Sequence, residues 1–203
     1  MLPAPGELLH FSEDPTITRF APHVAATAQQ PEAYVWANGP DRAPSYWFPR
    51  QCPRGTAWVG PGTSDEDRDR IVGAGSGDRV HAVEYRWLDR MRTTRLYAYR
   101  FAEADFRSFP FDADHAHAWV ATVEVEPLGP PEPVGDLLAV HEEAGIQLRV
   151  LTDLRPFWAA VAASTLEFSG IRLRNADPPI LPAGDPGLDV VPPAPPPLSG
   201  GRP

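Results

Sequence analysis

The segment PVGDLLAVHEEAGIQLRVLTDLRPFWAAVAASTLEFSGIRL, residues 133–173, carries the pattern that decides the fold. Its first part, Pro133–Ala144, has apolar residues at helical spacing and is followed by Gly145, a residue typical of helix C-termini. Leu154–Ala163 predicts a second helix, for which Asp153 is a plausible N-cap. The short apolar runs between and after these helices, 146–151 and 169–173, predict strands. This part of the chain therefore mixes helices and strands.

The upstream part of the chain is richer in strands. Six runs of β-branched, aromatic and other apolar residues predict strands: Leu8–Phe11, Ala33–Ala37, Thr56–Val59, Val80–Trp87, Arg95–Phe101 and Trp119–Val125. We expect the fourth and fifth runs to pair around a basic loop, Leu88–Thr93. Ser64 and Asp67 have the spacing of a capping box and predict a polar helix over Asp65–Ile71. Most predicted strands come in the first two-thirds of the chain and the main helices come after them. This order indicates one α+β domain over residues 1–175, with a mixed or antiparallel sheet.

Residues 176–203 have a different composition. They contain ten of the 26 prolines and no aromatic residue, and they end in a Gly- and Ser-containing stretch. Such a segment has little apolar surface to offset the entropy of ordering, so we predict a disordered, polyproline-like tail.

Charge and composition exclude several functions. The formal net charge is −9, which opposes non-specific binding to nucleic acid and to anionic membranes. All 18 basic residues are arginine, so Schiff-base chemistry and a P-loop phosphate site have no lysine to use. Cys52 is the only cysteine, which excludes an internal disulfide and predicts a reducing, cytoplasmic location. We predict neither a membrane span nor a secretory signal.

Three blocks of sequence resemble a family of uncharacterised bacterial proteins. They are LHFSE at residues 9–13, YWFPRQCPR at residues 46–54 and FSGIRLRNA at residues 168–176, with VWA at residues 35–37 between the first two. The resemblance covers roughly residues 7–176. It implies a shared fold and brings no activity with it.

A second resemblance is to ADP-ribosyltransferase-like domains. It rests on a first strand with Leu9-His10, on the segment Ile17–Pro22, on Val35–Ala37, and on Ala43 and Tyr46 in the next helix. In that fold the first-strand histidine holds the ribose of NAD and an aromatic residue stacks on the nicotinamide. The resemblance therefore implies that His10 and Tyr46 bind NAD as a substrate.

The same fold uses a late carboxylate to polarise the ribose at the reacting carbon. Glu124, Glu126 and Glu167 are the candidates here, and one of them at most takes this role. No motif selects among the three.

The turn at His10-Phe11-Ser12-Glu13 places polar groups at a strand end, where binding sites tend to form. On a strand His10 and Ser12 share a face, so both are predicted to bind the ligand. The alternative is a half-buried histidine bonded to backbone, with Ser12 stabilising the turn.

The segment Phe48–Arg54 is stiffened by two prolines and carries Arg50, Cys52 and Arg54. The arginines are predicted to bind a phosphate or carboxylate group, because a planar guanidinium on a stiff loop loses little entropy on binding. Neighbouring cations also favour the thiolate, which makes Cys52 a candidate nucleophile if the fold brings His10 close enough to act as its base. The alternative is a buried, inert Cys52 between arginines paired with carboxylates.

Two further patterns are weaker. His115 and His117 would share one face of a strand and, with Asp112, have the donor types of a metal site. A solvated turn is the better explanation, and we predict no metal. Arginines alternate with aromatics at 84–87 and 97–100, which suits base stacking, but the net charge favours cation–π packing.

The leading hypothesis is thus an ADP-ribosyltransferase-like protein that binds a small anionic or nucleotide ligand, with NAD as its substrate and no certain cofactor. The second is a small-molecule or protein-binding module without chemistry. The third is a thiol enzyme that uses Cys52 and His10.

Overall fold

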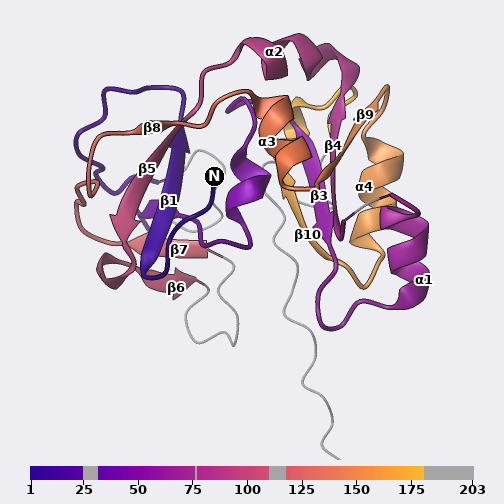
Figure 1. Ribbon diagram of the computed structural model, residues 1–203, viewed down its shortest axis with the longest axis horizontal. Helices are drawn as coiled ribbons and strands as arrows, with labels where there is room; N and C mark the ends of the chain where they lie inside the picture. Colours follow the sequence, from indigo (N-terminus) through magenta and orange to yellow (C-terminus); the bar gives the residue numbers. More distant parts are fainter. Residues whose placement is uncertain (25–31, 76, 110–117, 181–203) are drawn as a thin grey trace, which may run out of the picture.

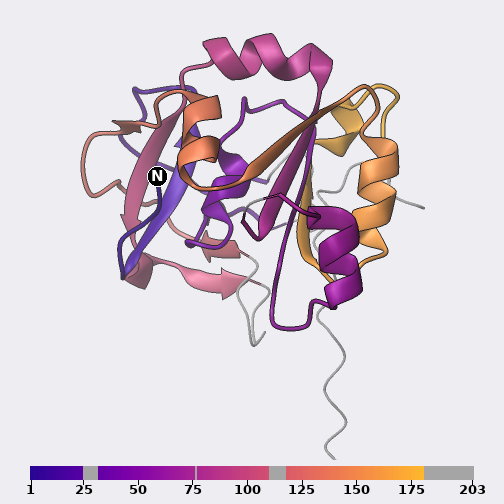
Figure 2. The ribbon, with the colours of Figure 1, turned by 45° about the vertical axis from the view of Figure 1, so that its right-hand side comes forward.

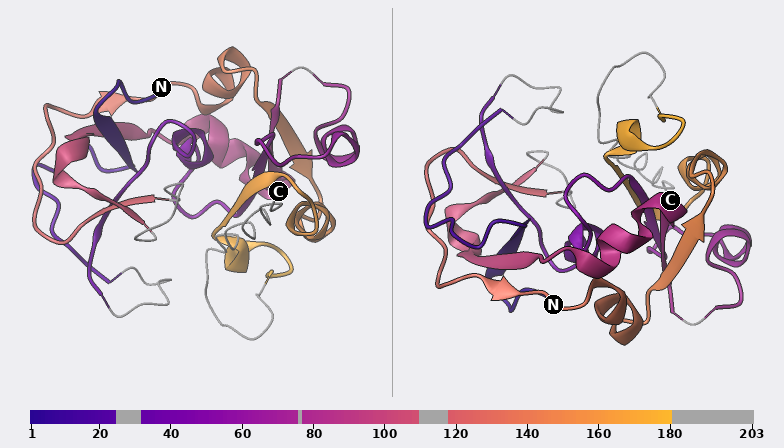
Figure 3. Two further views of the ribbon diagram at one scale, coloured as in Figure 1. Left: turned by 90° about the horizontal axis from the view of Figure 1, so that it is seen from below. Right: turned by 90° about the horizontal axis from the view of Figure 1, so that it is seen from above.

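The computed structural model describes residues 1–24, 32–75, 77–109 and 118–180, and it confirms the mixed α+β architecture. Figure 1 shows two β-rich halves side by side, one built on β1 and β5 and the other on β3, β4 and β10. A turn of 3-10 helix, η1 (Ala43–Tyr46), lies between the halves in each of the views in Figures 1, 2 and 3.

The first half consists of two three-stranded antiparallel sheets. Their strand orders are β1-β5-β8, with bounds Glu7–Ser12, Tyr97–Ala102 and Glu132–Pro133, and β2-β7-β6, with bounds Val35–Ala37, Ala118–Ala121 and Arg107–Phe109. Two backbone hydrogen bonds join the sheets, one from Leu9 N to Asn38 O and one from Asn38 N to Leu9 O. A buried cluster that includes Leu8, Val35 and Phe101 fills the space between them.

The second half is a four-stranded sheet of order β10-β3-β4-β9. The strands are Glu167–Ile171, Arg54–Trp58, Arg79–Glu84 and Gln147–Leu151, and the β4–β9 pair is parallel while the other pairs are antiparallel. Helix α4 (Arg155–Ala162) packs on one face. A Cβ at Gly55 would lie 3.1 Å from Phe157 and one at Gly170 would lie 2.5 Å from Trp158, so these glycines allow the aromatic side chains of α4 to approach the sheet closely.

The remaining helices are short. They are α1 (Asp65–Asp67), which continues as the π-helix η2 (Arg68–Val72), α2 (Leu88–Thr93), α3 (Leu137–Glu143), and the 3-10 turns η3 (Tyr85–Trp87), η4 (Glu103–Asp105) and η5 (Leu173–Asn175). Helix α2 runs from β4 to β5 and so connects the two halves (Figure 1). An apolar cluster with residues from both halves, among them Leu9, Trp47, Val83 and Leu137, lies where they meet.

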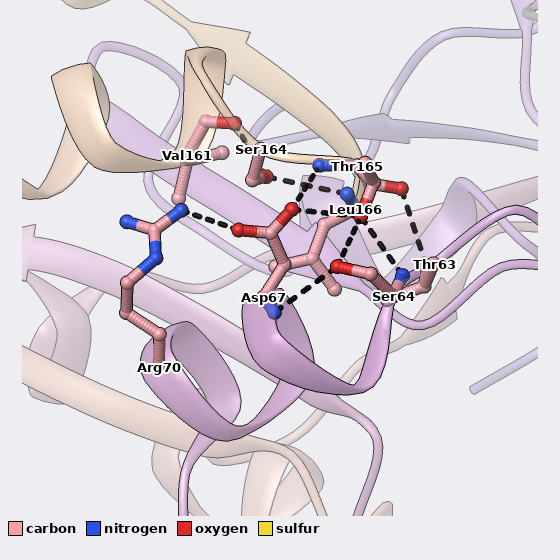
Figure 4. A network of polar contacts seen from close by, with 8 residues as sticks. All are labelled: Thr63, Ser64, Asp67, Arg70, Val161, Ser164, Thr165 and Leu166. Atoms are coloured by element: carbon pink, nitrogen blue, oxygen red, sulfur yellow. Dashed lines mark hydrogen bonds and ion pairs between the residues drawn. The ribbon is translucent and has the colours of Figure 1, made fainter.

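A polar network fastens α1 to the chain that follows α4 (Figure 4). Ser64 Oγ accepts a hydrogen bond from Asp67 N, which confirms the predicted capping interaction. Asp67 Oδ2 accepts from Thr165 N and Thr165 Oγ1 at 2.8 and 2.7 Å, and Asp67 Oδ1 pairs with Arg70. The first turn of this helix is therefore held by tertiary contacts as well as by its own cap.

The predicted pairing of Val80–Trp87 with Arg95–Phe101 is wrong. β4 pairs with β3 and β9, whereas β5 pairs with β1 and β8, so the two strands belong to different sheets. The predicted basic loop between them is α2, in which Asp89 lies near the N-terminus and Arg90 and Arg92 near the C-terminus, an arrangement that suits the helix dipole. The connection is therefore a crossover between halves.

Several predicted helix and strand boundaries differ from those in the structure. Helix α3 begins at Leu137, because Gly135 has φ +93° and Asp136 caps the helix through Leu138 N and Ala139 N. Leu154 is the N-cap of α4, although Asp153 does accept a hydrogen bond from Arg155 N. β7 ends at Ala121, and Val125 forms only an isolated bridge with Phe20.

The described start of the predicted tail is packed against the domain. Ala176 is buried, Asp177 N donates to Glu84 Oε1, and Ile180 contacts the apolar cluster beneath α4. The folded body thus extends past residue 175 to Ile180, and the rest of the predicted tail lies outside the described residues. None of the helices in the described ranges has the length and apolarity that a membrane crossing requires.

Candidate functional site

The end of β1 and the segment after η1 meet at one surface. Glu13 Oε1 accepts a hydrogen bond from Arg50 N at 2.7 Å. The rings of Phe11 and Tyr46 are parallel within 6°, with centroids 6.5 Å apart. Two segments about forty residues apart in sequence therefore lie side by side. They bring Tyr46 and Arg50 to the end of β1, where the charge of Arg50 also reaches His10.

His10 is half-buried and has a defined tautomer. Its Nδ1 lies 2.8 Å from the carbonyl oxygen of Trp36, and its ring packs against Phe20 at a centroid distance of 4.9 Å. Burial lowers the pKa of His10 to about 4, and the nearby charges of Arg50 and His23 lower it further, against the opposing effect of the Trp36 carbonyl. The neutral ring must donate from Nδ1, because a carbonyl only accepts, so Nε2 carries the lone pair.

Ser12 takes the turn-stabilising role that the sequence left as the alternative. Its side chain is buried, and its Oγ accepts a hydrogen bond from Asp14 N at 3.1 Å. Such a bond from a hydroxyl to the backbone two residues on is typical of turns.

The two arginines of the stiff segment have different environments. Arg50 is exposed. Arg54 is buried, and it donates from Nε to Ser45 O at 2.8 Å and from Nη1 to Cys52 O at 2.9 Å. Its guanidinium also lies 5.6 Å from the Tyr46 ring centroid, so Arg54 supports the ring from the protein side, and Arg50 is the arginine that faces solvent.

Cys52 is fully buried, with its Sγ 3.6 Å from Pro53 O. Burial raises the pKa of its thiol to about 12, although the cation of Arg54 works in the opposite direction. The predicted lowering of this pKa is therefore wrong in sign, because desolvation of the thiolate outweighs the attraction of the nearby guanidinium groups.

The three candidate carboxylates are separated by the fold. Glu124 and Glu126 both pair with Arg19, at 2.9 and 2.7 Å, on an exposed part of the first half. Glu167 begins β10 in the second half, opposite Trp58.

Arg42 links Glu167 to Tyr46. Burial lowers the pKa of Arg42, and the electrostatic influence of Tyr46, Glu167 and Asp41 opposes that shift. Arg42 therefore lies within electrostatic reach of both Tyr46 and Glu167.

Sequence reasoning missed Arg42, Trp58 and Arg79. Trp58 and Arg79 are register partners on β3 and β4, and the guanidinium carbons of Arg79 and Arg42 lie 4.3 and 5.0 Å from the centroid of the Trp58 ring. The alternation of Arg54, Thr56 and Trp58 with the small residues between them was the available signal, since residues two apart share a strand face.

A buried histidine pair was also missed. His81 on β4 and His141 on α3 are joined by a 3.0 Å contact between His81 Nδ1 and His141 Nε2. His141 Nδ1 lies 2.6 Å from Leu137 O and must donate to it, so His81 donates to His141. Both rings are neutral, because burial lowers the pKa of His141 to about 4 and that of His81 well below its ordinary value.

The third sequence block docks against the second. Asn175 Nδ2 donates to Gln51 O at 2.8 Å, and Arg86 donates to Asn175 O. The H-x-H pair and its neighbouring aspartates lie outside the described residues. Within the described ranges no group of three or more His, Cys, Asp or Glu side chains is arranged to hold a metal ion.

The chain is a mixed α+β protein in which the end of β1 on one half contacts Tyr46 and Arg50 at the junction with the other half. A family model described as "Family of unknown function (DUF6886)" matches residues 9–176, and the chain belongs to that family. No curated protein and no solved structure matches the chain.

Proposed function

We propose that this protein binds a nucleotide of the NAD class where the end of β1 meets the segment after η1, with His10, Tyr46 and Arg50 as its ligand-binding residues, as an ADP-ribosyltransferase-like protein would. The observation that carries the proposal is the contact between the β1 end and the segment after η1, made by the Glu13–Arg50 hydrogen bond and the Phe11–Tyr46 ring pair. This contact brings an aromatic surface and a cation to the end of β1, and Arg50 is close enough to His10 for its charge to lower the pKa of that ring, which supports a shared binding region.

Each group has a chemically distinct role. His10 Nε2, as a lone-pair acceptor, suits a ribose hydroxyl, which has a proton to donate. The Phe11 and Tyr46 rings offer aromatic surface to a planar base. The exposed Arg50 attracts phosphate, and it keeps its backbone hydrogen bond to Glu13 while its side chain contacts the ligand.

If transfer occurs, Glu167 is the carboxylate that the arrangement favours. It is the register partner of Trp58, whose ring Arg42 contacts, and Arg42 immediately precedes the η1 turn that ends at Tyr46. The bond between the ribose and nicotinamide breaks, and its electron pair leaves with nicotinamide, which becomes neutral. The acceptor nucleophile bonds to the ribose carbon and loses its proton. A carboxylate beside the ribose stabilises the positive charge that develops during this step.

Calorimetric titration of the full chain with NAD tests the proposal. We expect a measurable heat of binding, an affinity about tenfold lower in His10→Ala and Arg50→Gln, and no change in Arg95→Gln, which removes an exposed arginine elsewhere. An absence of heat at millimolar NAD, with an unchanged melting temperature, would refute the proposal.

The second candidate is a binding module without chemistry, favoured by the ion pairs that occupy Glu124 and Glu126. Release of nicotinamide from NAD separates the two candidates. An enzyme loses this activity in Glu167→Gln while it still binds NAD, whereas a binding module releases no nicotinamide in any variant.

A further inference from the structure

One row of side chains crosses the second sheet at the end of β3. Glu167, Trp58 and Arg79 are register partners on β10, β3 and β4, and they share the face that looks toward η1. Arg42 immediately precedes η1, and its guanidinium carbon lies 5.0 Å from the centroid of the same Trp58 ring. Trp58 is therefore contacted by two guanidinium groups, which its aromatic ring attracts and orients.

Arg79 carries a donor that lacks an acceptor. Its Nη2 donates to Asp41 O at 2.7 Å, whereas its Nη1 is buried and has no hydrogen-bond partner among the described residues. A buried N–H without an acceptor is costly, and an oxygen anion is the acceptor that a guanidinium binds best.

The charge of Arg42 beside Arg79 also favours an anion, against the carboxylates of Asp41 and Glu167, which lie within electrostatic reach of Arg42. Burial lowers the pKa of Arg79 to about 10, and Arg42 adds to this shift while Asp41 opposes it. Two partly desolvated cations at one tryptophan repel each other, and an anion between them would relieve that repulsion.

We propose that Arg79 and Arg42, held against Trp58, form an oxyanion subsite that takes the phosphate groups of the nucleotide ligand. This assignment rests on the proposed function for the identity of the ligand, and it deepens that function by giving the phosphates two arginines in addition to Arg50. The guanidinium plane of Arg79 is already oriented by Trp58 and Asp41, so little entropy is lost when the anion binds.

Binding requires a local adjustment, because Nη1 is covered in the unliganded chain. The groups able to move are Trp58 and Arg79, which are only partly buried, and the exposed Asp41. When these side chains shift, the anion takes a place beside Nη1 and supplies the hydrogen-bond acceptor that this atom lacks.

Calorimetry with three probes tests the subsite: NAD, inorganic pyrophosphate, and adenosine as a phosphate-free control. Arg79→Met removes the guanidinium but keeps an apolar stem over Trp58. We expect it to weaken NAD and pyrophosphate about tenfold or more and to leave adenosine unchanged. The matched control is Arg90→Met, because Arg90 is an exposed arginine that lies 5.5 Å from the Trp87 ring, and we expect it to bind all three probes as the wild type does.

The outcomes separate this inference from the proposed function. NAD and pyrophosphate binding that is unchanged in Arg79→Met overturns the subsite, even if His10→Ala still weakens NAD. Pyrophosphate binding that depends on Arg79, together with no binding of NAD or adenosine, supports the subsite and refutes the nucleotide proposal. If Arg79→Met fails to fold by circular dichroism, Arg79→Lys keeps the charge without the planar fork. A pyrophosphate affinity of Arg79→Lys equal to that of the wild type would then overturn the inference.

Discussion

Burial removes water from several ionisable side chains near the junction of the two halves. His10 and Cys52 both remain neutral at pH 7, because the pKa of the imidazole falls to about 4 and that of the thiol rises to about 12. Arg54 lies among backbone carbonyls and aromatic rings, where it serves the packing of Tyr46. At the residue scale, desolvation therefore decides which groups can accept, donate or attack.

Cys52 should be unreactive in the folded protein. Its side chain is fully buried, so a reagent cannot reach the sulfur, and its pKa is raised to about 12, so almost none of it is thiolate at neutral pH. We expect no modification by Ellman's reagent at pH 8 in native buffer and complete modification in denaturant. Rapid labelling of the native protein would contradict this and restore the thiol-enzyme hypothesis.

Substitution of Cys52 should affect stability more than activity. Cys52→Ala leaves a small gap in the apolar cluster at the junction and is expected to cost about 1 kcal/mol of unfolding free energy in urea denaturation. Binding of NAD should be the same as in the wild type. A loss of binding with unchanged stability would show that Cys52 contacts the ligand.

At the element scale, short helices depend on contacts made beyond themselves. The Ser64 cap predicts where the helix at α1 starts, but its first turn is completed by Thr165, about a hundred residues later (Figure 4). The connection between β4 and β5 has a basic sequence, and it forms α2 because its charges suit the helix dipole and its Met91 is buried at the junction.

Asp67→Asn should lower the melting temperature at pH 7. The hydrogen bonds from Arg70 and Thr165 hold the pKa of Asp67 well below its usual range, so the folded carboxylate stabilises the protein fully above its unfolded pKa of about 4. This stabilisation is lost as the pH falls through the folded value. The difference between variant and wild type should therefore narrow below about pH 4.

Thermal unfolding at pH 7 and pH 3 measures this effect, and Asp69→Asn is the matched control on the same helical segment because Asp69 is exposed. Equal melting temperatures for Asp67→Asn and Asp69→Asn at pH 7 would show that the network in Figure 4 adds nothing to stability.

At the scale of the whole molecule, the junction between halves holds both the candidate site and the histidine pair. His81 comes from the sheet of the second half and His141 from α3, and they meet beside Phe48. Phe11 and Glu13, at the end of β1 on the first half, contact Tyr46 and Arg50. The stability of this junction and the geometry of the site are therefore linked.

The histidine pair should make the protein sensitive to mild acid. Burial lowers the pKa of both rings, and the cation of Arg54 lowers both further, while that of Arg79 also affects His81. The folded values lie below the unfolded pKa of about 6.5, so the unfolded chain takes up protons first and stability falls as the pH drops below that value. The slope approaches about 1.4 kcal/mol per pH unit for each proton taken up.

Urea denaturation at pH 7.5 and pH 5.5 tests the predicted acid sensitivity of the histidine pair. The double variant His81→Leu/His141→Leu should show a smaller loss of stability between the two pH values, and His10 accounts for part of the slope that remains. His23→Gln, at an exposed position, should keep the wild-type slope. A double variant with an unchanged slope would mean that other groups carry the acid sensitivity.

Local patterns in the sequence were enough to predict the fold class, most strands, the Ser64 cap and the Gly145 helix end, because these depend on nearest neighbours along the chain. The sequence also placed Arg50 on a stiff segment, and that residue is exposed. Only the tertiary structure decided that β4 and β5 belong to different halves and that Arg42, Trp58 and Arg79 meet. Burial set the sign of the Cys52 pKa shift. Pairing partners and desolvation depend on residues far apart in the chain, and no local pattern encodes them.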